Sequence, residues 1–173
     1  VLWTYEEDWD SAINLSLTYN STSMKWDSPV FNVNLNLLDN ITYNITAADL
    51  AGNWMLETNF THLVYDNDNP SMIADMTTAT ATTGDPKTFT MDATDNIGVM
   101  QVFLSYHYID GNEYDRIPMT KGTGDNWFTV EITEDTLSPL VYEFLIVDTS
   151  YNSYTTPETT ITMLDNDKPQ IYG

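Results

Sequence analysis

The chain has 173 residues, of which 26 are acidic and 5 basic, so its formal net charge is −21. This charge disfavours binding to nucleic-acid phosphates and to anionic lipid, and the absence of cysteine excludes disulfides, thiolate metal sites and cysteine nucleophiles. Hydrophobic residues make up 42% of the chain, enough for packed cores, yet no apolar run is long enough to span a bilayer as a helix. The apolar set leans to Val, Ile, Tyr, Phe and Trp, and Thr is abundant, which predicts an all-β fold.

Acidic residues cluster near the beginning of the chain, at Glu6, Glu7, Asp8 and Asp10. A glycosidase needs a pair of carboxylates across its substrate, and this cluster could offer one. Neighbouring residues of an extended strand point to alternate faces, however, and the pattern implies no pocket. We therefore interpret the cluster as a solvated strand end.

Five Asn-X-Ser/Thr glycosylation sequons begin before residue 62, at Asn14, Asn20, Asn40, Asn44 and Asn59. Composition alone would produce roughly three or four sequons in such a chain, so their clustering is more informative than their number. We expect a glycan on at least one of Asn14, Asn20 and Asn59. Modification of Asn40 and Asn44 is not expected, because strand alternation turns Asn44 inward if its neighbours Thr42 and Thr46 face inward.

A long segment of the chain recurs after 99 residues. Residues 43–70 align without a gap on residues 142–169, and residues 31–37 match residues 128–134 if a length difference of two is allowed. Unrelated segments of the same length would share about two identities, whereas these share eight. The identical pairs are Tyr43/Tyr142, Asp49/Asp148, Asn53/Asn152, Thr61/Thr160, Asp66/Asp165, Asn67/Asn166, Asp68/Asp167 and Pro70/Pro169. A period near 100 residues is the size of an immunoglobulin-type sandwich.

The second copy is nearly complete and predicts the strands. Alternating segments predict strands at residues 87–93, 99–108, 127–133, 141–147 and 159–164, shorter strands at 71–80 and 114–119, and a turn at 109–112. Met100, Val102, Leu104 and Tyr106 should share one face of their strand. Short strands separated by turn signals favour an antiparallel β-sandwich.

Three segments resemble known surface repeats. Residues 42–53 (TYNITAADLAGN) are similar to the penultimate strand and turn of immunoglobulin-like and fibronectin type III-like repeats, which often read Y-x-x-x-A-x-D-x-x-G-N. Residues 81–86 (ATTGDP) and 95–99 (DNIGV) resemble repeats of archaeal cell-surface and S-layer-like proteins. The resemblance implies tandem immunoglobulin-like sandwiches at an extracellular cell surface, and it specifies fold better than function. Tyr151 stands where the first copy has a glycine, so we expect a different backbone conformation in the second turn.

The repeat predicts an incomplete unit at residues 1–69, a complete unit at 70–168 and the start of a following unit at 169–173. At an offset of 99, Val1 corresponds to Met100, so the first unit lacks counterparts of residues 71–99, which should supply the first two strands of the second. We expect those strands in upstream sequence of a longer array. The alternative is donor-strand exchange, in which a neighbouring copy inserts a strand; the tail at 169–173 could donate only one.

The motif Asp-Asn-Asp occurs at the end of each copy, and a proline follows one residue later. It comprises Asp66, Asn67 and Asp68, and again Asp165, Asn166 and Asp167. An extended Asp-x-Asp places two carboxylates on one side, and calcium prefers six to eight such oxygen ligands. The segment also resembles the acidic linkers of cadherin-type repeats, where calcium stiffens the junction. Further ligands would come from Asp92, Asp95, Asn96, Asp148 and Asp49, and the alternative is a solvated turn before proline.

Aromatic and histidine positions allow further interpretations. Tyr43 and Tyr142 stand at strand starts, where a tyrosine can return its hydroxyl to nearby backbone, and a plain core aromatic is an equal alternative. His62 and His107 lie in predicted strands outside any nucleophile motif, so we interpret them as structural or exposed. The tryptophans could stack on sugars, although core positions are more typical in sandwiches; they are Trp3, Trp9, Trp26, Trp54 and Trp127.

The sequence thus favours a non-enzymatic structural or adhesion module of an extracellular surface, forming a rod, S-layer, sheath or filament. Its partners would be neighbouring repeats or copies of the same protein. The alternative is a carbohydrate-binding or accessory module of a secreted enzyme, and a hydrolase is a third class with little in its favour. Exposed, coplanar tryptophans on one sheet would favour the sugar-binding alternative, and buried ones the rod.

Overall fold

The computed structural model describes residues 2–5, 10, 12–33, 36, 38–111, 113–122 and 127–169. Every regular element in this part of the chain is a β-strand, which confirms the all-β prediction. The chain divides into two compact units, Val1–Asp66 and Asn67–Gly173. The described residues include no helix with the length and hydropathy needed to cross a bilayer.

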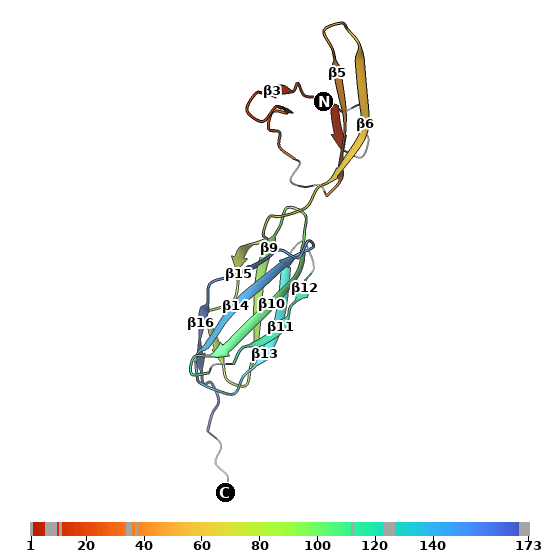
Figure 1. Ribbon diagram of the computed structural model, residues 1–173. Coiled ribbons are helices and arrows are strands. Elements are labelled where there is room, and N and C mark those ends of the chain that lie inside the picture. Colours follow the sequence, from red (N-terminus) through yellow and green to blue (C-terminus); the bar gives the residue numbers. More distant parts are fainter. Residues whose placement is uncertain are drawn as a thin grey trace. The chain divides into compact units, whose positions relative to one another are not determined.

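The second unit is a sandwich of two sheets (Figure 1). One sheet has the order β11-β10-β14-β16-β8, with β15 also paired to β14, and the other has the order β12-β13-β9-β7. All pairs are antiparallel except β8 with β16, which is parallel. The strands are β7 Ser71–Asp75, β8 Thr80–Thr82, β9 Pro86–Thr94, β10 Val99–Tyr108, β11 Asp115–Pro118, β12 Thr120–Lys121, β13 Trp127–Thr133, β14 Leu140–Asp148, β15 Ser153–Thr155 and β16 Thr159–Leu164.

The five main strands predicted for this unit are present, and β10, β13 and β16 have the predicted bounds. The segment 71–80 forms two strands, β7 and the beginning of β8, rather than one. The shared face predicted for β10 holds for Val102, Leu104 and Tyr106, all buried, but not for Met100, which is 44% exposed. A register irregularity between Val99 and Gln101 interrupts the alternation, because a bulge turns one residue out of the pleat.

One core lies between the two sheets. Alternate residues of β9 and β14 face inward, and Phe89, Met91, Phe144 and Ile146 are at most 1% exposed. The ring of Phe89 packs edge-on against Tyr142 with centroids 5.2 Å apart. The contact joins β9 of one sheet to β14 of the other, so burial of these apolar side chains holds the layers together.

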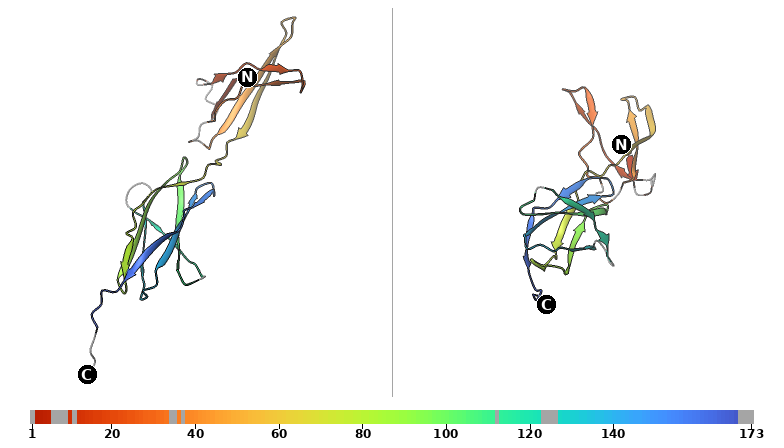
Figure 2. Two further views of the ribbon diagram at one scale, coloured as in Figure 1. Left: turned by 90° about the vertical axis from the view of Figure 1, so that its left-hand side faces the viewer. Right: turned by 90° about the horizontal axis from the view of Figure 1, so that it is seen from below.

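The first unit has one four-stranded sheet, of order β2-β1-β5-β6, and a separate hairpin β3-β4. Figures 1 and 2 show β5 and β6 as a long hairpin. β6 contains a bulge: Tyr43 pairs with Phe60 and Ile45 pairs with Glu57, so one residue of β5 stands opposite two of β6. At the bulge, Asn59 has a φ of 63°, and its N–H donates to Oδ1 of Asn44. The strands are β1 Leu2–Tyr5, β2 Ile13–Asn14, β3 Thr18–Asn20, β4 Lys25–Asp27, β5 Asn40–Ala48 and β6 Trp54–Leu63.

The turn after β5 and the turn after β14 have the same backbone hydrogen bonds. In the first unit, Asp49 N donates to Asn53 O at 3.0 Å, and Gly52 N donates to Asp49 O at 3.1 Å. In the second, Asp148 N donates to Asn152 O at 3.0 Å, and Tyr151 N donates to Asp148 O at 3.3 Å. The repeat seen in the sequence therefore recurs as a structural motif at an offset of 99 residues.

The expectation that Tyr151 changes the conformation of the second turn was wrong. Its φ is 69°, in the same left-handed region as the 84° of Gly52. The Oδ1 of Asp148 accepts the N–H of Asn152 at 2.8 Å, and its Oδ2 accepts the Asn152 side-chain amide at 2.9 Å. These bonds fix the turn from the side chains, which offsets the cost of a left-handed tyrosine.

Candidate functional site

Asp148 is the buried anchor of the candidate site. Its side chain is 0% exposed, and its Oδ1 accepts backbone N–H groups of Ser150 at 2.7 Å and Asn152 at 2.8 Å. An ionised carboxylate is buried at low cost only when such donors satisfy it. The turn after β14 therefore supplies the donors that a buried carboxylate needs.

Asp95 lies in the loop between β9 and β10 and has one satisfied and one unsatisfied oxygen. Its Oδ1 accepts the N–H groups of Ile97 at 2.9 Å and Gly98 at 2.8 Å. Its Oδ2 is buried and has no hydrogen-bond partner among the described residues. A bond of 3.0 Å from Thr149 N to Gly98 O ties this loop to the turn that carries Asp148. A buried carboxylate oxygen without a donor is the kind of atom that a cation would satisfy.

The third carboxylate is that of Asp66, which is covalently joined to Asn67, where the second unit begins. One oxygen from each of Asp66, Asp95 and Asp148 lies within 4.8 Å of the other two. Like charges at this spacing repel, and a divalent cation would offset the repulsion. The donor set contains only oxygen, which fits a hard cation such as calcium better than a thiolate- or imidazole-seeking metal.

The structure thus places the carboxylates of Asp66, Asp95 and Asp148 in one group. The neighbouring residues of the linker, Asn67 and Asp68, are exposed and outside the group of three. Asp92, in β9, is also outside it, although its Oδ1 is buried without a hydrogen-bond partner among the described residues. The sequence named Asp148 among several further ligand candidates, and its burial, which the sequence does not show, depends on the packing of the whole unit.

The second copy of the linker motif has different surroundings. Asp165, Asn166 and Asp167 are all exposed. The N–H of Asp167 donates to Oδ1 of Asp165 at 2.9 Å, and the amide of Asn166 donates to Oδ2 of Asp85 at 2.8 Å. In the part of the chain that the structure describes, Asp165 and Asp167 join no group of three metal-binding side chains.

Four of the five sequon asparagines, Asn14, Asn20, Asn40 and Asn59, are exposed. Asn44 is half-buried, and its Oδ1 accepts the N–H of Asn59 at 2.8 Å. The side-chain amide of Asn20 donates to Asp27 at 2.9 Å, so a glycan there would replace a hydrogen bond. Among the acidic residues of the N-terminal cluster, Glu6, Glu7 and Asp8 lie outside the described residues, and Asp10 is exposed.

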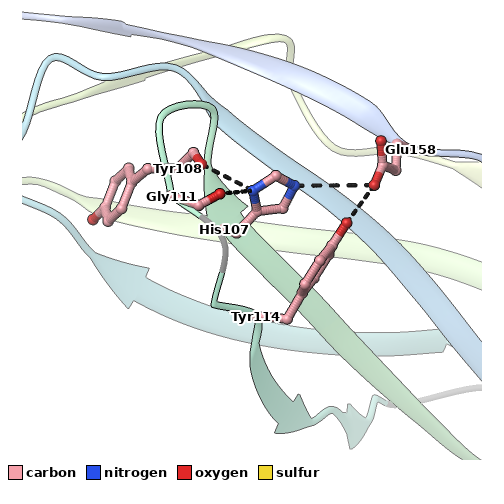
Figure 3. A network of polar contacts seen from close by, with 5 residues as sticks. All are labelled: His107, Tyr108, Gly111, Tyr114 and Glu158. Carbon is pink, nitrogen blue, oxygen red and sulfur yellow. Dashed lines mark hydrogen bonds and ion pairs between the residues drawn. The ribbon is translucent and has the colours of Figure 1, made fainter.

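Polar contacts fix His107 in place (Figure 3). Its Nδ1 faces the carbonyl oxygens of Tyr108 at 2.9 Å and Gly111 at 3.3 Å, so this nitrogen carries the proton. Its Nε2 lies 3.9 Å from Oε1 of Glu158, which also accepts the hydroxyl of Tyr114 at 2.5 Å. The contacts join β10 to the β10–β11 and β15–β16 connections, and no serine or threonine nucleophile takes part in them.

The tyrosine hydroxyls bond to side chains, not to the backbone that a tyrosine corner requires. Tyr142 donates to Oδ2 of Asp75 at 2.6 Å, and the hydroxyl of Tyr43 lies 3.2 Å from Nε2 of His62. The tyrosine-corner interpretation was therefore wrong for both residues. Tyr142 is nevertheless a core aromatic, at 2% exposure.

Two tryptophans contradict the expectation of core positions. Trp26, in β4, is 65% exposed, and Trp54, in β6, is 78% exposed. Trp26 packs against Tyr19 of the same small hairpin, with ring centroids 5.3 Å apart at 59°. A two-stranded hairpin has too little apolar surface to bury an indole. The side chains of Trp3, Trp9 and Trp127 lie outside the described residues.

No family model matches the chain, and no curated protein matches it. Among solved structures, the superoxide reductase (neelaredoxin) from Ignicoccus hospitalis is similar over 56% of this chain and 81% of its own, with a TM-score of 0.38 and 8% sequence identity. A similarity this distant carries no argument about fold family or activity.

Proposed function

We propose that the chain is a non-catalytic structural module of an extracellular cell surface, built from tandem immunoglobulin-like units. The observation that carries the proposal is the strand order of the second unit. An immunoglobulin-type sandwich places strands A, B, E and D in one sheet and C, F and G in the other. In that scheme the order β7-β9-β13-β12 corresponds to A-B-E-D, and β10-β14-β16 corresponds to C-F-G.

The repeat supports a tandem arrangement. The turn with Asp49 and the turn with Asp148 share their backbone bonds, and the linker motif recurs after each copy. Modules of this kind act as rods or as the elements of a surface layer or filament, with neighbouring repeats or copies as partners. A strongly acidic, sequon-bearing chain suits a glycosylated exterior.

We also propose that the carboxylates of Asp66, Asp95 and Asp148 bind calcium. Calcium would satisfy the buried Oδ2 of Asp95 and would neutralise three clustered charges. Asn67, Asp68 and Asp92 remain candidates for completing the ligand shell through rearrangement or water. Asp165 and Asp167 would serve a following unit in the same way.

Two experiments test these proposals. Antibodies against the chain should label intact cells of its source, and labelling only after lysis would contradict the surface assignment. Millimolar calcium should raise the melting temperature of the chain above that in chelator, because a ligand that binds only the folded state stabilises it. Equal midpoints, together with no calcium retained after dialysis, would contradict the ion site.

A carbohydrate-binding module is the second candidate, because Trp26 is exposed beside an apolar groove in the first unit. An exposed indole can stack on a sugar ring. A glycan array read with the wild-type chain and with Trp26→Ala decides: saturable binding that is lost in the variant favours the sugar, and no binding contradicts it.

A further inference from the structure

One face of the sheet in the first unit is an open apolar groove. Two adjoining cavities, of about 250 and 620 Å³, run along it. The floor is a row of alternate residues of β5: Ile41, Tyr43, Ile45 and Ala47. Leu15, Leu17 and Trp26 form the opposite wall.

The second unit shows what covers the same row in a closed sandwich. At an offset of 99, the row corresponds to Leu140, Tyr142, Phe144 and Ile146 of β14. Tyr142 and Phe144 are 2% and 1% exposed, and the ring of Phe89 in β9 packs on Tyr142. Their counterparts Tyr43 and Ile45 are only half-buried. The difference follows from β9, since the described residues of the first unit form no strand that lies over the row as β9 does.

The sheet edge formed by β6 in the first unit differs in the same way from its counterpart in the second unit. In the second unit, Thr162–Leu164 of β16 pair in parallel with Thr80–Thr82 of β8, which covers that edge. The counterparts of Thr162–Leu164 are residues 63–65. Leu63 is 52% and Tyr65 76% exposed, and β6 pairs with β5 alone among the described strands. An uncovered strand edge with apolar side chains is a template for another strand.

Both surfaces are therefore covered in the second unit by one stretch of chain, residues 70–94, which holds β7, β8 and β9. We propose that the groove and the β6 edge of the first unit are a receptor for a strand segment of this chemistry, supplied by another repeat of the same kind. The segment would place an apolar row like that of Phe89, Met91 and Ala93 on Tyr43 and Ile45, and a short parallel strand on residues 63–65. Recognition would combine backbone pairing with side-chain pockets.

The test uses the full chain and a fluorescently labelled peptide of residues 70–94, with binding followed by anisotropy. The peptide should bind saturably at one site per chain. Trp26→Ala should weaken the binding at least about tenfold, because it removes part of the groove wall. Trp54→Ala is the matched control: that indole is exposed but lines neither cavity, so affinity should not change.

A peptide carrying Phe89→Asp and Met91→Asp should not bind, since charges cannot enter the groove. Failure of the native peptide to bind the folded chain would overturn the proposal. Equal affinity for wild type and Trp26→Ala would also overturn it, because the peptide would then occupy another surface. Dimerisation of the chain without peptide, lost in Trp26→Ala, would mean that the groove binds the same face of a second chain. That outcome would also overturn the proposal.

The inference rests on the repeat that the proposed function also uses. The calcium-dependent melting and the labelling of intact cells do not involve Trp26. Loss of peptide binding therefore contradicts the receptor alone, and an unchanged melting midpoint contradicts the ion site alone.

Discussion

The hydroxyl of Tyr142 donates a hydrogen bond of 2.6 Å to the carboxylate of Asp75, 67 residues earlier in the chain. Tyr142 belongs to β14 in one sheet and Asp75 ends β7 in the other, so the bond crosses the sandwich. Burial, with the bond to Asp75, raises the pKa of Tyr142 well above its ordinary value. The hydroxyl therefore remains a donor throughout the physiological pH range.

Tyr142→Phe should destabilise the second unit by about 1–3 kcal/mol, because it removes the Tyr142 donor from Oδ2 of the partly buried Asp75 and leaves that carboxylate only the N–H of Thr77 on Oδ1. Hydrogen exchange of the β14 amides measures this for the second unit alone. Tyr43→Phe is the control: its hydroxyl contacts His62 on an exposed surface, and the loss should be less than about 1 kcal/mol. An equal loss of unfolding free energy in both variants would mean that the bond across the sandwich stabilises the fold no more than an exposed contact does.

Tyr151→Gly should stabilise the second unit by up to about 1 kcal/mol. The left-handed φ of 69° costs a tyrosine more than a glycine, and the side chain is 79% exposed, so little packing is lost. The reciprocal change Gly52→Ala should destabilise the first unit by a similar amount, because the added Cβ meets no atom within 4 Å and only backbone strain acts. Urea titrations of the two variants check the opposite signs.

Asp95→Asn should abolish the calcium-dependent rise in melting temperature. The amide keeps an acceptor for Ile97 and Gly98 but removes the charge that would face the ion. Asp10→Asn is the matched control, since Asp10 is exposed and outside the group of three, and it should retain the full rise. A full rise in Asp95→Asn would remove Asp95 from the site.

Glu134→Gln should raise stability at neutral pH. Burial, the largest cause, and the charge of Asp135 raise the pKa of Glu134 above the ordinary 4.5. A raised folded-state pKa favours folding below the unfolded value and loses that contribution as the pH rises through the folded value. The stability advantage of the glutamine variant should therefore shrink as the pH falls through the raised folded-state pKa of Glu134, and it should vanish below the ordinary value of 4.5. Melting temperatures between pH 3 and 8 test this, and a pH-independent difference would contradict it.

Much of the second unit follows from sequence, because its strands alternate with period two and carry dense β-branched and aromatic residues. The limits appear where tertiary structure overrides the pattern. Lys87 lies on the inward side of β9 and is 8% exposed, yet its Nζ donates to Thr78 O at 2.5 Å and to Thr80 O at 2.9 Å. Burial lowers the pKa of this lysine. No local pattern predicts acceptors supplied by a separate segment.

The candidate site shows the same division. The linker motif and the loop after β9 marked Asp66 and Asp95 as ligands, because closely spaced acidic and amide residues are readable in sequence. That Asp148 rather than Asp92 completes the group depends on how the β14 turn packs on the loop at Gly98. In the first unit, residues 31–33 lie outside any strand although they match the start of β13, since strand formation needs a partner that the pattern cannot supply.

The parallel pairing of β8 with β16 has a mechanical consequence. In sequence, β8 lies in the N-terminal part of the second unit and β16 in its C-terminal part. The two strands are joined by backbone hydrogen bonds such as Thr162 N to Ala79 O at 3.0 Å and Thr83 N to Leu164 O at 2.9 Å. Tension applied through both termini pulls two parallel strands in opposite directions along their length. All the bonds between them then bear the load together in shear, whereas an antiparallel hairpin pulled at its open end breaks them one after another. The second unit is thus built to resist stretching along the chain.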